Sequence, residues 1–219
     1  MPDYLLLKFA HIMALVYWLG GDLGTFLASR HVINRALSPE ARHVALRIML
    51  ACDMGPKLAM PLILPLGLQL AYMSGSLAIS IPALIAAWVA CLYWFGVVLV
   101  LFTNEGKPFT VRLSTIDFYF RIAVVLVLLG YGGSLLLDAA TPRWVAWKLL
   151  VFAAMVACGI AIRLHLKPFP GAFGAIMSGG PNEDANRVMA LSVQRCRPFV
   201  WMIWGGLFLN TALGIHLVN

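Results

Sequence analysis

The segment LLLKFAHIMALVYWLGGDLGTFLASRH, residues 5–31, decides the fold of this chain. It is apolar over most of its length, and about 20 such residues cross the hydrocarbon core of a bilayer as a helix. Two ionisable side chains, His11 and Asp22, nevertheless lie inside it. A charge at the centre of a bilayer costs at least about 2.5–3.5 kcal/mol, so each of these residues needs a partner or a function.

The whole chain has the composition of an integral membrane protein. Of its 219 residues, 62% are hydrophobic and 11% are charged, and a soluble domain of this length has no interior large enough to bury so much apolar surface. The first apolar segment begins at Tyr4 and runs for about 25 residues, which is too long for the core of a signal peptide. We therefore expect it to remain as a membrane span.

Six apolar segments are long enough to cross a membrane. They predict an all-α, polytopic helix bundle that forms a single integral-membrane domain over residues 1–219. The predicted spans are residues 4–29, 56–74, 81–102, 119–138, 144–165 and 199–218.

The positions of the basic residues indicate how the chain is oriented. Of the 16 Lys and Arg residues, 12 fall in three stretches, residues 30–47, 103–121 and 163–198. The positive-inside rule places these stretches in the cytoplasm and both termini outside, as in a multi-pass protein of the bacterial inner membrane. The same distribution accounts for the net charge of +7, so the charge does not indicate a nucleic-acid partner.

Two of the segments that connect the predicted spans also contain sequence patterns typical of helices. Ser38 and Pro39 predict the N-cap and first turn of a helix over residues 39–54, which Gly55 and Pro56 then break or kink. The longest connection begins with KPFPGAFGAIMSGGPN, which is too rich in glycine and proline to predict a helix. It continues with EDANRVMALSVQRC, an amphipathic helix around residues 183–196 that we expect to lie on the cytoplasmic membrane surface.

The polar residues of the first span share one helical face. With 3.6 residues per turn, the face holds His11, Trp18, Asp22, Thr25 and Ser29. Three neighbouring glycines, Gly20, Gly21 and Gly24, allow another helix or a flat ligand to approach closely. We therefore expect this face to point into the bundle.

The intramembrane charges fall at two depths. His11 and Lys148 lie near the outer side of their spans and predict one outer-leaflet site. Asp22 lies about 16 Å further along the first helix, at the level where Lys57 enters the second span. Asp22 and Lys57 can form a structural ion pair. Alternatively, they can belong to a proton route or contact the propionate group of a bound cofactor.

Each of the outer residues also has a simpler interpretation. His11 can hydrogen-bond a neighbouring helix, and Lys148 can extend its ammonium group to the lipid headgroups. His216, three residues from the C-terminus, is either an interfacial residue or a second metal ligand.

Two segments resemble a known family. LKFAHIMALVYWLGG, residues 7–21, resembles the first helix of the HemJ-type protoporphyrinogen oxidases and of the related copper-resistance D-type membrane proteins. RWVAWKLLVFAAMV, residues 143–156, is similar to the W-x-x-x-K-L helix of that family. Together they cover about a quarter of the chain. The resemblance implies that His11 is the haem-associated histidine and Lys148 the functionally important lysine. This chain departs from the pattern by an additional span and by Asp22.

The first hypothesis is a haem b protein with a redox role. A neutral His11 imidazole ligates the iron, and Trp18 belongs to the same site. Lys148 and Arg143 meet the haem propionates or an anionic tetrapyrrole. If the oxidase resemblance holds, protoporphyrinogen loses hydrogens to a quinone, with Asp22, Lys57 and Lys148 as the catalytic candidates.

Two alternatives come from other functional classes. In a copper or proton-coupled permease, His11, Met13 and Asp22 mark the path, because a His and Met pair favours Cu(I). In a non-catalytic subunit, the polar face of the first helix packs against a partner in a homo-oligomer or a larger membrane complex.

Overall fold

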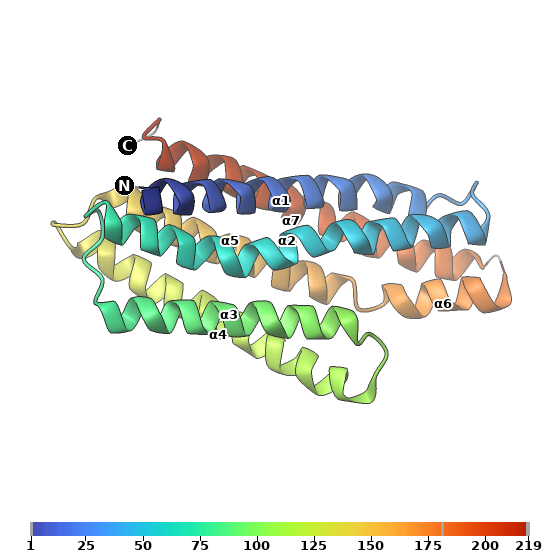
Figure 1. The fold of residues 1–219 in the computed structure, drawn as a ribbon. Helices are drawn as coiled ribbons and strands as arrows, with labels where there is room; N and C mark the ends of the chain where they lie inside the picture. Colours follow the sequence, from blue (N-terminus) through green and yellow to red (C-terminus); the bar gives the residue numbers. More distant parts are fainter. Residues whose placement is uncertain (1, 181, 218–219) are drawn as a thin grey trace.

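The computed structural model describes residues 2–180 and 182–217, and every regular element of that part is an α-helix (Figure 1). Both termini lie at one end of the bundle, which we call the terminal end (Figure 1). We call the opposite end, where α6 lies, the basic end. The helices are α1 (Pro2–Val32), α2 (Pro39–Met73), α3 (Ile81–Thr103), α4 (Pro108–Leu137), α5 (Arg143–His165), α6 (Phe169–Gly179) and α7 (Glu183–Gly214).

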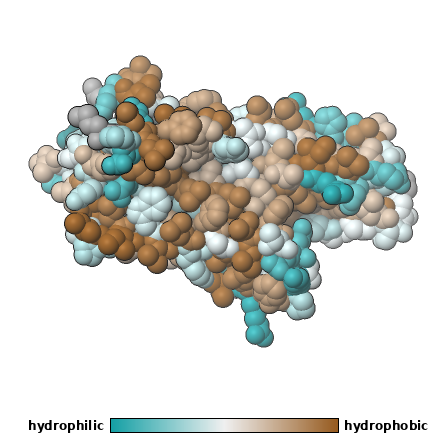
Figure 2. Space-filling model, viewed as in Figure 1, coloured by the Kyte–Doolittle hydropathy of each residue, from teal (hydrophilic) through white to brown (hydrophobic). Residues whose placement is uncertain are grey.

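The all-helical fold is confirmed, with five to six helices long and apolar enough to cross a membrane. α1 to α4 and the stretch Arg143–Gly179 meet the length and hydropathy requirements in the described part of the chain. The sixth predicted span, residues 199–218, lies in α7 as far as Gly214, and its last residue is outside the described part of the chain; α7 is long but less apolar than the other long helices. Large hydrophobic side chains are exposed along the helices. Figure 2 shows them over the body of the molecule, with hydrophilic residues concentrated near its ends.

α2 is one continuous helix of 35 residues. Ser38 is its N-cap and accepts a hydrogen bond from the Ala41 backbone N–H, and Pro39 lies in the first turn, as predicted. Gly55 and Pro56 do not break it, although a proline inside a helix removes one backbone hydrogen bond.

The prediction for residues 166–198 is partly wrong. Residues 169–179 form α6 despite their glycines and prolines. Asn182 caps α7 by accepting a hydrogen bond from the Ala185 N–H, so the predicted helix after residue 183 is confirmed. This helix is not a separate element, because it runs without interruption through Pro198 into the last predicted span.

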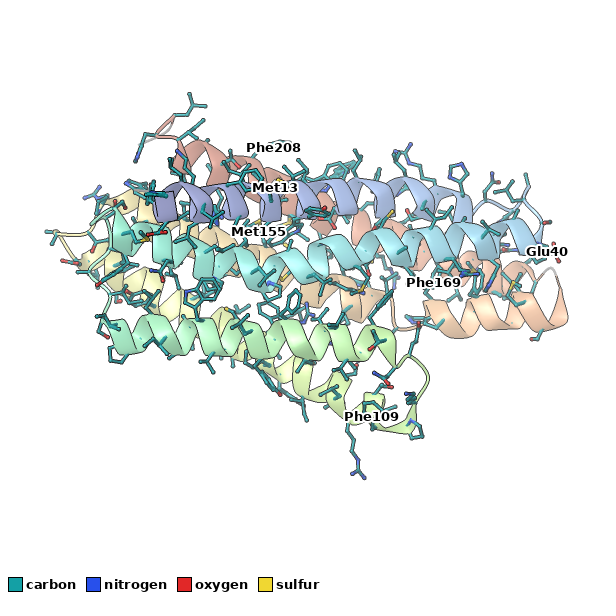
Figure 3. All side chains as sticks on the ribbon, in the orientation of Figure 1. Met13, Glu40, Phe109, Met155, Phe169 and Phe208 are labelled. Carbon is teal, nitrogen blue, oxygen red and sulfur yellow. The ribbon has the colours of Figure 1, made fainter. Side chains whose placement is uncertain are left out.

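The basic end has an apolar cluster of its own, which explains α6. α1 and α2 are about 46 and 52 Å long, well beyond a hydrocarbon core of about 30 Å, and they project past α3 together with α7 (Figure 1). Phe169, labelled in Figure 3, belongs to α6 and packs into this cluster. We call it the basic-end core, and its buried members are Val32, Ala45, Phe169, Phe173, Ile176, Ala185, Met189 and Val193.

Arg42 ties the basic-end core together. Its side chain is only 4% exposed, and it donates from Nε to the Val32 carbonyl at 2.7 Å and from Nη1 to Asn186 Oδ1 at 2.9 Å. The guanidinium therefore satisfies a carbonyl at the C-terminal end of α1 and links α2 to α7.

α1 and α2 touch backbone to backbone midway along their length. A Cβ atom on Gly21 would lie 2.6 Å from the Cys52 carbonyl oxygen, and one on Gly55 would lie 2.7 Å from the Tyr17 carbonyl oxygen. Only glycine fits at such a distance, so the predicted close approach is confirmed at Gly21.

A buried ionic cluster links α4 and α5. Asp117 is 3% exposed and accepts hydrogen bonds from Arg121 Nε at 3.0 Å and from Arg163 Nη1 at 2.8 Å. The Arg121 guanidinium also lies 5.2 Å from the centre of the Trp94 ring. Because the carboxylate contacts two arginines at once, it sets the positions of α4 and α5 relative to each other.

Candidate functional site

A cavity of about 260 Å³ lies between α1, α2, α5 and α7, toward the terminal end. Its walls are apolar over most of their area and include Leu15, Ile63 and Leu207. The deepest part is formed by nearly fully buried side chains, since Trp18 is 1% and Met155 is 2% exposed. The Trp18 ring packs edge-on against Phe152 at 5.9 Å. Trp18, a predicted site residue, therefore lines this cavity.

The cavity brings together His11 and Lys148, which come from helices far apart in the sequence. His11 lies on α1 and Lys148 one turn into α5. Both side chains line the cavity, so the predicted grouping of these two residues near one end of the bundle is confirmed. Lys8, Tyr4 and Ser74 complete its polar rim.

The His11 imidazole packs against the backbone of α2 at Gly67. A Cβ atom on Gly67 would lie 3.1 Å from His11 Cε1, which is closer than ordinary van der Waals contact. Nδ1 of the ring is buried and has no hydrogen-bond partner among the described residues. A buried polar atom without a partner is rare in folded proteins, and such atoms often indicate a missing ligand, water or ion.

Substitution of Gly67 by alanine is expected to displace the His11 ring by a few tenths of an ångström. Residues that only orient a metal ligand typically contribute about 10–100-fold to metal affinity, so we expect a loss in this range for any metal group bound at His11. The measurement is a titration of the purified variant with haemin. Gly96→Ala is the control, because a Cβ atom there meets nothing within 4 Å. Equal affinity of both variants would contradict the prediction.

Lys148 is held on the opposite wall by an aromatic ring and a glycine. Its ammonium nitrogen lies 5.9 Å from the centre of the Trp144 ring. A Cβ atom on Gly214 would lie 2.6 Å from the same nitrogen, so this glycine leaves room for the ammonium group. The group is therefore positioned to contact an anionic part of a ligand.

Asn210 adds a second unpartnered atom to the cavity. Its Nδ2 donates to the Lys148 backbone carbonyl at 3.3 Å, which fixes the orientation of the amide. The remaining Oδ1 is buried and unpartnered among the described residues. The cavity thus offers a ring nitrogen at His11, an ammonium donor at Lys148 and a carbonyl acceptor at Asn210.

Other predicted residues lie outside the cavity. Arg143 is the first residue of α5 and does not line it. His216 packs edge-on against Trp144 at 5.1 Å without lining the cavity, so the structure does not place it opposite His11. Met13, labelled on α1 in Figure 3, is also absent from the lining, whereas Met155 on α5 is part of it.

The predicted pair of Asp22 and Lys57 is wrong. Lys57 pairs with Asp53, one turn earlier on the same helix. An i, i+4 partner is always within reach on a helix, so it competes successfully with a carboxylate on a neighbouring helix. Asp22 Oδ2 is buried and makes no hydrogen bond to the described residues.

Sequence reasoning missed Lys8, Asn210 and Gly67. Asn210 had a usable signal, because an amide inside an apolar span is costly unless it has a partner. Gly67 had none, because its role depends on the ring of His11 from another helix.

Comparison with known proteins gives no match: no protein-family model, curated protein or solved structure is similar to the chain. The residues of the cavity therefore carry the functional inference.

Proposed function

We propose that the chain is a multi-pass protein of the bacterial inner membrane that binds haem b in the cavity and has a redox role. The observation that carries the proposal is the buried, unpartnered Nδ1 of His11 on the cavity wall. A neutral imidazole is a common ligand of haem iron. The resemblance of residues 7–21 to the HemJ-type oxidases agrees with the same residue.

The other cavity residues fit the chemistry of haem. The apolar walls suit the macrocycle, and Lys8 and Lys148 suit its propionates, because charge-assisted hydrogen bonds to carboxylates are strong. His11 would hold the iron, and the bound group would supply a one-electron iron couple. Pockets for small molecules usually have about 300–1,000 Å³, so a macrocycle must also use the space at the open side of this cavity.

The resemblance also leads us to propose a reaction of the protoporphyrinogen oxidase type. The tetrapyrrole would lose hydrogens in pairs, and each pair would reduce one quinone to a quinol. Lys148 would then bind the acidic side chains of the tetrapyrrole, which places the anionic part of the substrate near the terminal end.

The test is a reduced-minus-oxidised visible spectrum and a pyridine haemochrome assay on protein purified in detergent from haem-replete cells. We expect a b-type spectrum with about one haem per chain. A colourless protein that also fails to bind added haemin would overturn the proposal.

Asn210 favours a second candidate, a quinol-binding protein. A quinol has a hydroxyl at each end of its ring, and Asn210 Oδ1 can accept a hydrogen bond from one of them. A quinone has only acceptors and would leave this oxygen unpaired. A cavity of about 260 Å³ also suits a single substituted ring.

Substitution of Asn210 by leucine separates this candidate from haem binding. Tryptophan fluorescence, reported by Trp18 and Trp144 in the cavity, measures the binding of duroquinol and duroquinone. We expect the wild type to prefer duroquinol by about 10-fold, because an unpaired buried polar group costs about 1–3 kcal/mol, and the variant to lose this preference. Asn34→Leu, at an exposed position near the basic end, is the control. Equal binding of both compounds to the wild type would rule this candidate out.

A further inference from the structure

Two carboxyl groups lie together where α1 and α2 cross. Gly21 on α1 packs against the backbone carbonyl of Cys52 on α2. Asp22 is the residue after Gly21, and Asp53 is the residue after Cys52. The two residues therefore flank the same close contact between α1 and α2. This pair lies one turn beyond Trp18, the residue at the floor of the cavity.

The positive charges near this crossing are already engaged. Lys57 forms an ion pair with Asp53. On the basic-end side, the guanidinium groups of Arg30 and Arg197 lie 4.9 and 6.0 Å from the centre of the Phe26 ring. In the described part of the chain, no salt bridge is formed by Asp22, and its Oδ2 is buried without a hydrogen bond.

An ionised carboxylate in this position would be costly. Removing a carboxylate from water without a counter-ion disfavours its charged form, and a second carboxylate nearby disfavours it further. One lysine can neutralise one of the two groups, and the structure pairs it with Asp53. With two nearby carboxyl groups and only one lysine to neutralise them, one carboxyl group keeps its proton.

We propose that Asp22 is a proton-binding site and carries its proton at neutral pH as a carboxylic acid. Asp53 forms its ion pair with Lys57. The exposed fractions of the Asp53 and Lys57 side chains are 28% and 45%, so this ion pair reaches the surface of the bundle. A redox reaction in the cavity that takes up a proton would then have a proton donor one turn beyond Trp18 on α1. The site itself exists whether or not the cavity binds haem.

The test is infrared spectroscopy of the purified protein in H₂O and in D₂O at neutral pH. Exposed carboxyl groups and those in ion pairs are ionised at this pH and give no carboxylic-acid C=O band. We expect the wild type to show one such band, shifted in D₂O because its proton exchanges. The band should be absent in Asp22→Asn and unchanged in Asp3→Asn, the exposed control on the same helix.

Three results would overturn the proposal. They are the lack of the band in the wild type, its persistence in Asp22→Asn, and its loss in Asp3→Asn. Asparagine is neutral and has nearly the same shape as a carboxylic acid, so we expect Asp22→Asn to keep the wild-type melting temperature. If this variant does not fold, Asp22→Glu replaces it, and a C=O band of unchanged frequency would then contradict the proposal. None of these readouts depends on haem, so failure of the haem proposal remains distinguishable.

Discussion

Substitution of His11 by alanine is expected to abolish the b-type spectrum of the purified protein. Loss of a residue that only orients a metal ligand costs about 10–100-fold in affinity, so loss of the ligand itself is expected to cost at least about 100-fold. The measurement is the haem content per chain by pyridine haemochrome, together with a haemin titration of the variant. The substitution removes the buried Nδ1 of His11, the atom proposed to bind the iron.

His43→Ala is the matched control for this experiment. The His43 ring stacks on Phe173 in the region of the basic-end core, far from the cavity along α2, and its loss should leave the haem content unchanged. A spectrum that survives in His11→Ala would show that another residue binds the iron.

Substitution of Asp117 by asparagine is expected to produce the largest loss of stability. Asparagine has nearly the same shape but carries no charge, so Arg121 and Arg163 would lose their shared counter-ion in a mostly buried location. Breaking a buried ion pair by removing one partner costs about 3–5 kcal/mol. For a chain of this size, we expect the melting temperature in detergent to fall by roughly 6–20 °C.

Arg35→Gln is the control for the effect of charge alone. Arg35 pairs with Glu183 at 2.7 Å, but the two side chains are 51% and 80% exposed. Exposed ion pairs contribute about 0–1 kcal/mol, so the melting temperature should change little. If the melting temperature fell by a similar amount in both variants, burial would not explain how much the Asp117 cluster contributes to stability.

Hydrophobicity and charge distribution predicted much of this architecture. Long apolar segments specify helices, and helical rise is regular, so the levels of His11 and Lys148 followed from their positions along the chain. Their presence in one cavity agrees with that estimate. The same regularity predicted that the polar face of α1 points inward, and Trp18 and Ser29 are indeed buried.

The predictions that were missed or wrong share a physical cause. Each depends on which neighbouring residue a side chain contacts in the folded protein. Asp117 was overlooked because its partners include an arginine on another helix, and the basic residues of that stretch were interpreted by orientation only. Lys57 found Asp53 on its own helix, which a search for partners between helices does not consider. α6 forms because its apolar face completes the basic-end core, and tertiary packing outweighs the low helix propensity of its glycines.

α1, α2 and α7 each run as one helix from the cavity wall to the basic-end core. A helix is stiff along its axis, and Arg42 fastens all three together at the far end. A change in the tilt of one of these helices at the cavity is therefore opposed at the basic end by the hydrogen bonds that Arg42 makes to the other two.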